Sequence, residues 1–182
     1  MSTKTQATIV DLYRLPDNGK AELVNGEIIR MSPTGDMPAR AGGAIYARLR
    51  SVERQAGGRA YPDNVGFRVK LPHRGSFSPD AAFYIGKSSG MKFLEGAPVF
   101  AAEIRSENDY GREVELKLAA KRQDYFAAGT LVVWDVDLLG VDVVKVYRAA
   151  APENPNIYRR GETAEAEPAV PGWRMPVDEL FD

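Results

Sequence analysis

The sequence predicts an α/β fold in which a mixed central sheet is flanked by two main helices, with an N-terminal β-hairpin. Apolar runs of strand length alternate with two longer stretches of helical periodicity, and this alternation is typical of α/β proteins. The 182 residues, 44% hydrophobic and 27% charged, suit one globular domain over residues 1–182. We expect its core to span about residues 13–148, with a C-terminal extension over 149–182.

The N-terminal third should contain a short helix, a hairpin and one long helix. The expected elements are a helix over 8–15, a turn at 16–19, a hairpin over 21–31, a loop over 32–38 and a helix from about Ala39 to Gln55. Asn25-Gly26 predicts the hairpin turn, because both residues tolerate positive φ. Gly57-Gly58 should end the helix.

The remaining chain should supply most of the sheet. The expected elements are one or two strands in 61–71, a loop over 72–78, strands over 80–85 and 99–104, a helix over 108–128, strands over 131–136 and 141–148, and an edge strand near 156–160. Gly129 follows the long helix, where glycine is the usual residue. The fully apolar run 131–136 suits the centre of a sheet.

The composition excludes several kinds of chemistry. The chain has no cysteine, so it forms no disulfide and has no thiolate nucleophile. With His73 as its single histidine, any metal should be held mainly by oxygen, which favours magnesium, manganese or calcium. No apolar run approaches the ~20 residues of a membrane span, and residues 1–6 lack the apolar core of a signal peptide. We therefore expect a cytoplasmic protein that does not associate with membranes.

Three charged residues interrupt segments that should be apolar. Asp80 begins one predicted strand, Glu103 lies within the next, and Lys121 lies on the predicted buried face of the long helix. Charged groups are seldom buried unless they are paired or bound to a metal. Together they suggest a hydrolytic site that holds a divalent cation, although each carboxylate alone could form a salt bridge at a strand end.

Spacing supports this grouping. Val114, Leu118, Lys121 and Tyr125 share one helix face because they are separated by four, three and four residues. Glu103 alternates with Ala101, so the two side chains should share one face of their strand. If the strands of Asp80 and Glu103 are neighbours, both carboxylates can converge on one cation. Alternatively, Lys121 extends along the rim of the helix toward solvent.

The charge is unevenly distributed although the net charge is only −1. Residues 40–74 contain eight Arg or Lys and two acidic residues, whereas residues 150–182 contain seven acidic residues and three arginines. The basic segment could present a face to a phosphate backbone. A solvated helix with arginine-rich loops would give the same pattern.

Several segments resemble one known protein family. They are Glu22-Leu23-Val24-Asn25-Gly26-Glu27-Ile28-Ile29, Met31-Ser32-Pro33-Thr34-Gly35, Ser78-Pro79-Asp80, Ala102-Glu103-Ile104-Arg105-Ser106, Lys121-Arg122-Gln123-Asp124-Tyr125-Phe126-Ala127-Ala128-Gly129 and Val133-Trp134-Asp135-Val136-Asp137. In order and spacing, over about residues 13–147, the sequence resembles the Uma-type putative restriction endonucleases of the PD-(D/E)xK nuclease superfamily.

The resemblance implies a restriction-endonuclease-like domain that hydrolyses DNA phosphodiester bonds with a metal-activated water. Asp80 and Glu103 would bind Mg²⁺ or Mn²⁺, and a basic residue would complete the site. Glu22 is a further candidate, by analogy with the extra N-terminal acid of this fold. DNA is the implied partner, and a homodimer could cut both strands.

Two departures from the family pattern matter. The general motif has a lysine two residues after the second acid, where this chain has Arg105; Lys121 is then the candidate for a displaced catalytic lysine. The histidine expected soon after the Ser-Pro-Thr-Gly loop is missing from residues 35–40. The alternative function is therefore a catalytically inactive nuclease-fold module that binds nucleic acid or a protein partner.

The arginines of the basic segment are the predicted nucleic-acid contacts. We expect Arg48, Arg68 and Arg74 to contact phosphates, with Arg105 as a further candidate, and the binding should depend strongly on salt.

Overall fold

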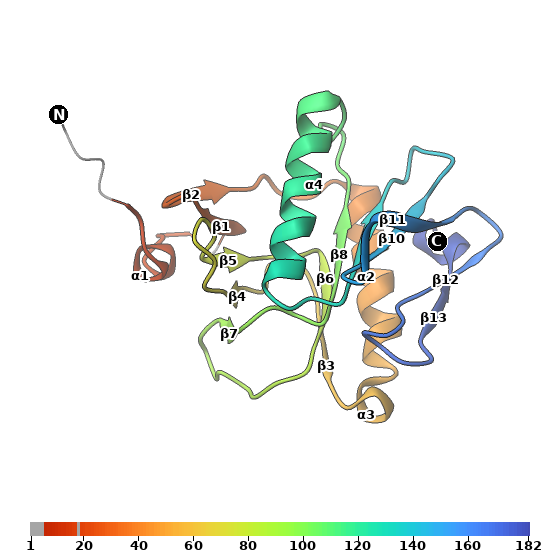
Figure 1. Cartoon of the computed structure of the whole chain (residues 1–182), viewed down its shortest axis with the longest axis horizontal. Coiled ribbons are helices and arrows are strands. Elements are labelled where there is room, and N and C mark those ends of the chain that lie inside the picture. Colours follow the sequence, from red (N-terminus) through yellow and green to blue (C-terminus); the bar gives the residue numbers. More distant parts are fainter. Residues whose placement is uncertain (1–5, 18) are drawn as a thin grey trace.

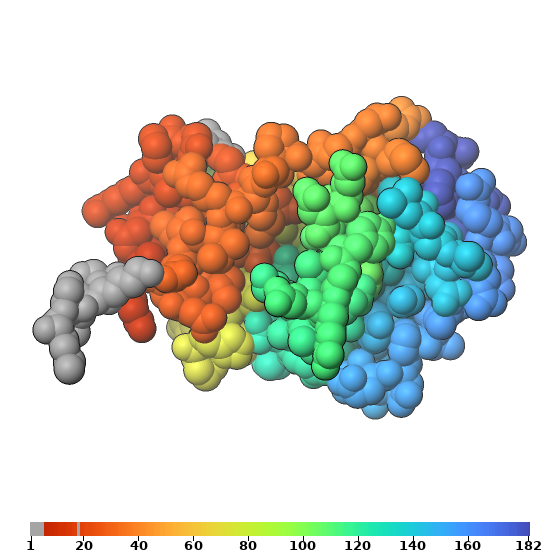
Figure 2. All heavy atoms as spheres, turned by 90° about the horizontal axis from the view of Figure 1, so that it is seen from above, coloured from red at the N-terminus to blue at the C-terminus, as the bar shows by residue number. Residues whose placement is uncertain are grey.

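The structure is a computed structural model that describes residues 6–17 and 19–182. Residues 1–5, which belong to the segment for which no signal peptide is predicted, lie outside the described residues. So does Asn18, at the centre of the turn predicted over 16–19. Figure 2 shows an elongated molecule with the N-terminal elements at one end and the C-terminal residues at the other.

The centre of the fold is a six-stranded mixed sheet (Figure 1). Its strands, in spatial order, are β11 (Ala151–Tyr158), β10 (Val144–Arg148), β9 (Val132–Val136), β8 (Phe100–Ile104), β6 (Ala81–Tyr84) and β3 (Arg59–Tyr61). The pair β8–β9 is parallel and the other pairs are antiparallel. The apolar strand β9 lies inside the sheet and is fully buried, as its composition predicts.

Two long helices cover opposite faces of this sheet. On one face α2 (Asp36–Arg50) packs Ile45 and Leu49 into a core with Ala102. On the other face α4 (Arg112–Ala127) packs Tyr125 against Ala101. Ala101 and Ala102 are successive residues of β8, so their side chains point to opposite faces. The prediction of a mixed sheet flanked by helices is confirmed.

The N-terminal hairpin is also confirmed, and it forms a small layer beside the main sheet. It consists of β1 (Ala21–Val24) and β2 (Glu27–Arg30), and Asn25 and Gly26 turn with φ values of 51° and 69°. The short helix α1 (Ile9–Tyr13) packs on it. A three-stranded sheet of β5 (Ser76–Phe77), β4 (Phe67–Arg68) and β7 (Leu94–Glu95) continues this layer, and Ser76 Oγ accepts a hydrogen bond from Leu23 N.

The core extends beyond residue 148, where we expected it to end. The hairpin of β12 (Thr163–Glu165) and β13 (Arg174–Pro176) and the 3₁₀ helix η1 (Val177–Leu180) follow the central sheet. Trp173 and Met175 are buried in the same core as Trp134 and α2. The Pro- and Glu-rich sequence of this segment does not predict the packing, because its apolar residues are isolated between polar ones.

The boundaries of the two long helices differ from the prediction. Helix α2 begins at Asp36 because Pro38 lies in its first turn, where no backbone N–H is needed. It ends at Arg50, and the separate turn α3 (Glu53–Ala56) follows, ended by Gly57. Helix α4 begins at Arg112 because Asp109 accepts hydrogen bonds from Ser106 and closes a turn before it. In the part of the chain that the structure describes, no helix combines the length and apolarity that crossing a membrane requires.

Candidate active site

The topology brings Asp80 and Glu103 to one cleft. Strands β6 and β8 are antiparallel neighbours, with Ala81 opposite Ala102; Asp80 immediately precedes β6, and Glu103 lies in β8. Both line a cleft of about 370 Å³ together with Lys121, residues 31–34 and the first residues after β8. The conditional prediction that the two strands are neighbours is therefore fulfilled.

Lys121 points into this cleft. Its Nζ lies 2.9 Å from Glu103 Oε2 and 2.9 Å from Glu22 Oε1, and its side chain is only 16% exposed. Tyr125, one turn further along α4, donates a 2.6 Å hydrogen bond to Glu103 Oε1. The helix face predicted from spacing thus carries both a lysine and a tyrosine to the second acid.

Glu22 is held from behind by a buried ionic network. Its Oε2 accepts from Arg74 Nη1 at 2.7 Å, and its Oε1 accepts from Ser78 N at 2.9 Å. Arg74 also pairs with Asp124 Oδ2 at 2.7 Å, and His73 contacts Asp124 Oδ1 at 2.6 Å. Since both carboxylate oxygens of Glu22 are occupied, this residue is placed to position Lys121.

Asp80 has a different lysine. Lys20 Nζ lies 2.5 Å from Asp80 Oδ1 and 2.7 Å from Asp63 Oδ1, and Ile104 N donates to Asp80 Oδ2 at 2.7 Å. Asp80 and Glu103 therefore each have their own ammonium partner: Lys20 for Asp80 and Lys121 for Glu103.

Burial and charge set the protonation states of the Glu103 side of the cleft. Burial raises the pKa of Glu103, and the negative charges of Asp80 and Glu22 add to this effect, whereas Lys121 opposes it. For Glu22 burial acts in the same direction, but Lys121 and Arg74 outweigh it and lower the pKa. Burial opposes the charged form of Lys121, yet Glu103 and Glu22 raise the pKa of its ammonium above the ordinary value. Lys121 is consequently a cation at neutral pH.

Arg105 does not face the cleft with a free guanidinium. It forms a two-point ion pair with Asp135, with Nε–Oδ1 and Nη2–Oδ2 distances of 2.8 and 2.9 Å. It also pairs with Glu115, and its side chain is only 5% exposed. The hydrogen bonds from Arg105 to Asp135 hold the pKa of the guanidinium above its usual value. Of the two basic residues considered for the motif, only Lys121 contacts an acid of the predicted metal site.

The three arginines expected to contact phosphates lie apart from the cleft lining. Arg48 of α2 pairs with Glu179 of η1. Arg68 of β4 lies 3.4 Å from Glu95. Arg74 is interior, with a side chain only 7% exposed, and its ion pairs hold Glu22 and Asp124. A buried guanidinium paired on two sides is not placed to contact a DNA backbone.

The donor set suits a hard divalent cation. Asp80 and Glu103 offer only carboxylate oxygens, and Mg²⁺ commonly uses one or two carboxylates, several waters and substrate phosphates. Among the residues that the structure describes, no cluster of three or more Asp, Glu, His or Cys is arranged to hold a metal. Asp80 and Glu103 are the residues of the cleft that could hold such a cation together with waters and a substrate phosphate.

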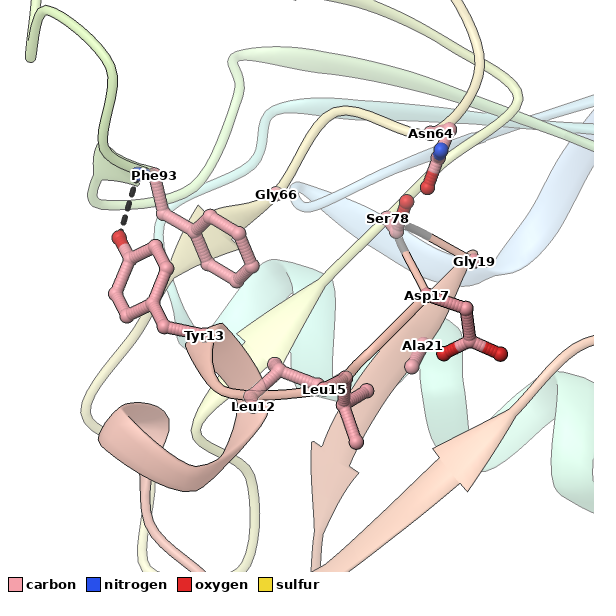
Figure 3. A pocket seen from close by; sticks show the side chains of 10 residues that line it. All are labelled: Leu12, Tyr13, Leu15, Asp17, Gly19, Ala21, Asn64, Gly66, Ser78 and Phe93. Atoms are coloured by element: carbon pink, nitrogen blue, oxygen red, sulfur yellow. Dashed lines mark hydrogen bonds between the residues drawn. The ribbon is translucent and has the colours of Figure 1, made fainter.

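A second cavity, of about 220 Å³, lies between α1, β1 and the segment before β7 (Figure 3). Tyr13 and Phe93 form one wall, where the Tyr13 hydroxyl accepts a 2.6 Å hydrogen bond from Phe93 N. Ser78 Oγ is buried there without a hydrogen-bond partner among the described residues. The one carboxylate in the lining, Asp17, pairs with Arg30. This cavity lacks the paired acids of the first one.

Sequence reasoning missed Lys20, Asp63 and the hydroxyl contact of Tyr125. Lys20 had a signal: it precedes Glu22 by two residues, so strand alternation places both side chains on one face. The spacing of Tyr125 predicts only that it lies on the buried face of the helix, and it gives no indication of the hydroxyl contact with Glu103. Asp63 lies in a loop, and no pattern in the sequence links it to Asp80.

The fold is restriction-endonuclease-like. The structure resembles the crystal structure of a protein described as a putative nuclease belonging to DUF820 from Anabaena variabilis, with a TM-score of 0.74, 18% sequence identity, and coverage of 96% of this chain and 97% of that chain. A search of curated proteins finds no match.

The particular family follows from the sequence. The family model described as Uma2, putative restriction endonuclease, matches residues 9–178. The chain belongs to this family, as its motifs indicated.

Proposed function

We propose that this protein is a Mg²⁺- or Mn²⁺-dependent endonuclease that hydrolyses DNA phosphodiester bonds in the cytoplasm. The observation that carries the proposal is the convergence of Asp80, Glu103 and Lys121 on one cleft, with Lys121 in direct contact with Glu103. Two hard carboxylates beside an ammonium match the needs of phosphoryl transfer, in which negative charge must be held and stabilised.

Each side chain has a distinct role in this proposal. Asp80 and Glu103 would hold the divalent cation, which supplies binding of the scissile phosphate and activation of water. Lys121 stabilises negative charge that develops on the phosphate and orients the attacking water. Because its pKa is raised, Lys121 acts as a cation and not as the general base. Glu22 and Tyr125 position Lys121 and Glu103.

The DNA backbone would follow the rim of the cleft along α4. Lys117 is exposed and lies one helical turn before Lys121, so the two share a face. It is a better placed phosphate contact than Arg48, Arg68 or Arg74. A homodimer would present two clefts to the two strands, and sedimentation with and without DNA tests for it.

The decisive experiment measures cleavage of supercoiled and linear DNA in Mg²⁺ and in Mn²⁺. Asp80→Asn and Glu103→Gln should each reduce cleavage by more than ~100-fold. A loss of that size is larger than the loss of about 10–100-fold that is typical when a residue only supports a metal ligand. Asp142→Asn, which removes a surface carboxylate paired with Arg159, is the matched control and should cleave like wild type. Wild-type cleavage by the first two variants would refute the mechanism.

A non-catalytic module is the second candidate. It is favoured by the missing histidine of residues 35–40 and by the lysine partners of Asp80 and Glu103. Such a module would bind DNA or a protein without cleaving DNA in either metal. DNA binding that persists in Asp80→Asn, with no cleavage by wild type, would support this candidate over the first.

A further inference from the structure

Lys20 is an additional cation at the cleft that the motif residues do not include. Its side chain is 12% exposed and lines the same cleft as Asp80 and Glu103. Its Nζ lies between two carboxylates, 2.5 Å from Asp80 Oδ1 and 2.7 Å from Asp63 Oδ1. No other lysine contact in the described residues joins these two acids.

The two acids differ in how readily they accept a cation. Asp80 is mostly buried, at 14% exposed, and its Oδ2 already accepts from Ile104 N, so Oδ1 carries its main exchangeable contact. Asp63 is 42% exposed, on the solvent side of the same ammonium. A divalent cation on Asp80 would meet the ammonium of Lys20 at the same oxygen, and two cations cannot share that position without strong repulsion.

We propose that Lys20 competes with the divalent cation for Asp80, and that it releases Asp80 but keeps its contact with Asp63 when the cation binds. The inference rests on the proposed function, because it assigns the cation to Asp80. The lysine stem is flexible and its ammonium donates three hydrogen bonds, so Lys20 can release Asp80 while it keeps Asp63. Lys20 is then a positioning residue that sets the affinity for metal, and Asp63 is the partner that it retains.

The proposal predicts opposite effects of removing the two residues. Lys20→Met keeps an unbranched side chain without the charge, so Mn²⁺ should bind about tenfold more tightly, as expected when a competing contact worth ~1.4 kcal/mol is lost. Asp63→Asn weakens the retained contact, so Lys20 should stay on Asp80 and Mn²⁺ should bind more weakly. Lys20→Arg retains a cation and should bind Mn²⁺ within about twofold of wild type, since only the loss of charge removes the competition.

The experiment is isothermal titration of Mn²⁺ into the EDTA-treated full chain, with wild type and the three variants. Lys70→Met, which removes an exposed lysine outside the cleft lining, is the matched control for net charge and should leave the affinity unchanged. Tighter binding by Lys20→Met together with weaker binding by Asp63→Asn supports the proposal. If Lys20→Met does not fold, Asp63→Asn and Lys20→Arg still test it.

Two results would overturn it. Equal or weaker Mn²⁺ binding by Lys20→Met would show that Lys20 does not compete with the metal. Absence of Mn²⁺ binding in both wild type and Lys20→Met would do the same. The proposed function is tested separately. If Asp80→Asn abolishes metal-dependent cleavage and Lys20→Met leaves the affinity for Mn²⁺ unchanged, the competition is refuted but the proposed endonuclease activity is supported.

Discussion

At the scale of single residues, the cleft depends on charges that are buried but paired. Arg74 and Glu22 are each almost fully covered, and each has two or more partners of opposite charge or hydrogen-bonding capacity. A buried charge is tolerated only with such partners. Removing one member of the network would therefore leave the remaining buried charges without a partner, so that their desolvation is no longer offset.

Arg74→Met should destabilise the protein by about 3–5 kcal/mol, because Glu22 and Asp124 would lose their shared buried partner. Arg68→Met is the matched control: it breaks the exposed pair with Glu95 and should cost less than ~1 kcal/mol. Urea unfolding followed by tryptophan fluorescence measures both. Similar losses in the two variants would contradict the buried network.

The pairing of Glu22 also predicts a pH dependence. The pKa of Glu22 is lowered in the folded protein, because Lys121 and Arg74 outweigh the effect of burial. A lowered folded-state pKa stabilises the protein above the ordinary value of 4.5 and loses this effect as pH falls through the folded-state value. The stability gap between wild type and Glu22→Gln should therefore be widest near pH 7 and narrow below pH 4.5. Urea titrations at pH 7, 5, 4 and 3 measure it, and a constant gap would argue against the ionised pair.

At the scale of elements, the site depends on how α4 ends. Thr130 N donates to Tyr125 O at 3.0 Å and Gly129 N donates to Phe126 O at 3.1 Å, a Schellman motif. Gly129 has φ +106°, which L side chains rarely adopt. This ending lets the chain turn directly into β9, and thereby fixes where Lys121 and Tyr125 meet Glu103.

Gly129→Ala should destabilise the protein by about 1–2 kcal/mol through backbone strain alone, since an added Cβ would meet no atom within 4 Å. Gly43→Ala is the matched control within α2. Its added Cβ also meets nothing within 4 Å, but its backbone is helical, so the change should stabilise by about 0.5–1 kcal/mol. Thermal or urea unfolding measures both, and effects of the same sign would show that φ at Gly129 is unimportant.

At the scale of the whole molecule, the fold decides where charged side chains lie and what they pair with. The charge balance of a sequence segment does not decide this. The basic segment 40–74 is divided among α2, α3, β3 and β4, and its Arg48 and Arg68 pair with acids of distant segments. The acids near the C-terminus supply one of these partners, Glu179. With a net charge of −1, the proposed function requires that any affinity for DNA come from a local surface at the cleft.

DNA binding should accordingly be salt-dependent and centred on α4. Lys117→Ala should weaken binding of duplexes of different sequence about equally, and reduce the slope of log K against log salt by about one. Arg48→Ala, which removes a residue of the predicted basic face, should leave that slope unchanged. Fluorescence anisotropy at several salt concentrations, in Ca²⁺ to prevent cleavage, measures the slopes. If Arg48→Ala reduced the slope more than Lys117→Ala did, the basic segment 40–74 would have to be part of the DNA-binding surface.

Some elements of the fold are predictable because they depend on short stretches of sequence. The hairpin at Asn25-Gly26, the apolar strand β9 and the end of α4 at Gly129 rest on local backbone chemistry, so the sequence alone predicts them. The two-residue strands β5 and β7, and the packing of Trp173 into the main core, depend on partners far along the chain. Their local sequences carry no periodicity that would reveal them.

For the site, the sequence alone predicts which charged residues interrupt apolar segments: Asp80, Glu103 and Lys121. Their partners follow from the fold, because an ion pair requires two atoms within a few ångströms, whatever their separation in the chain. It placed Lys20 and Asp63 beside Asp80, turned Arg74 inward to Glu22, and paired Arg105 with Asp135. Periodicity indicates which face a side chain occupies, whereas strand order and loop path decide what it meets there.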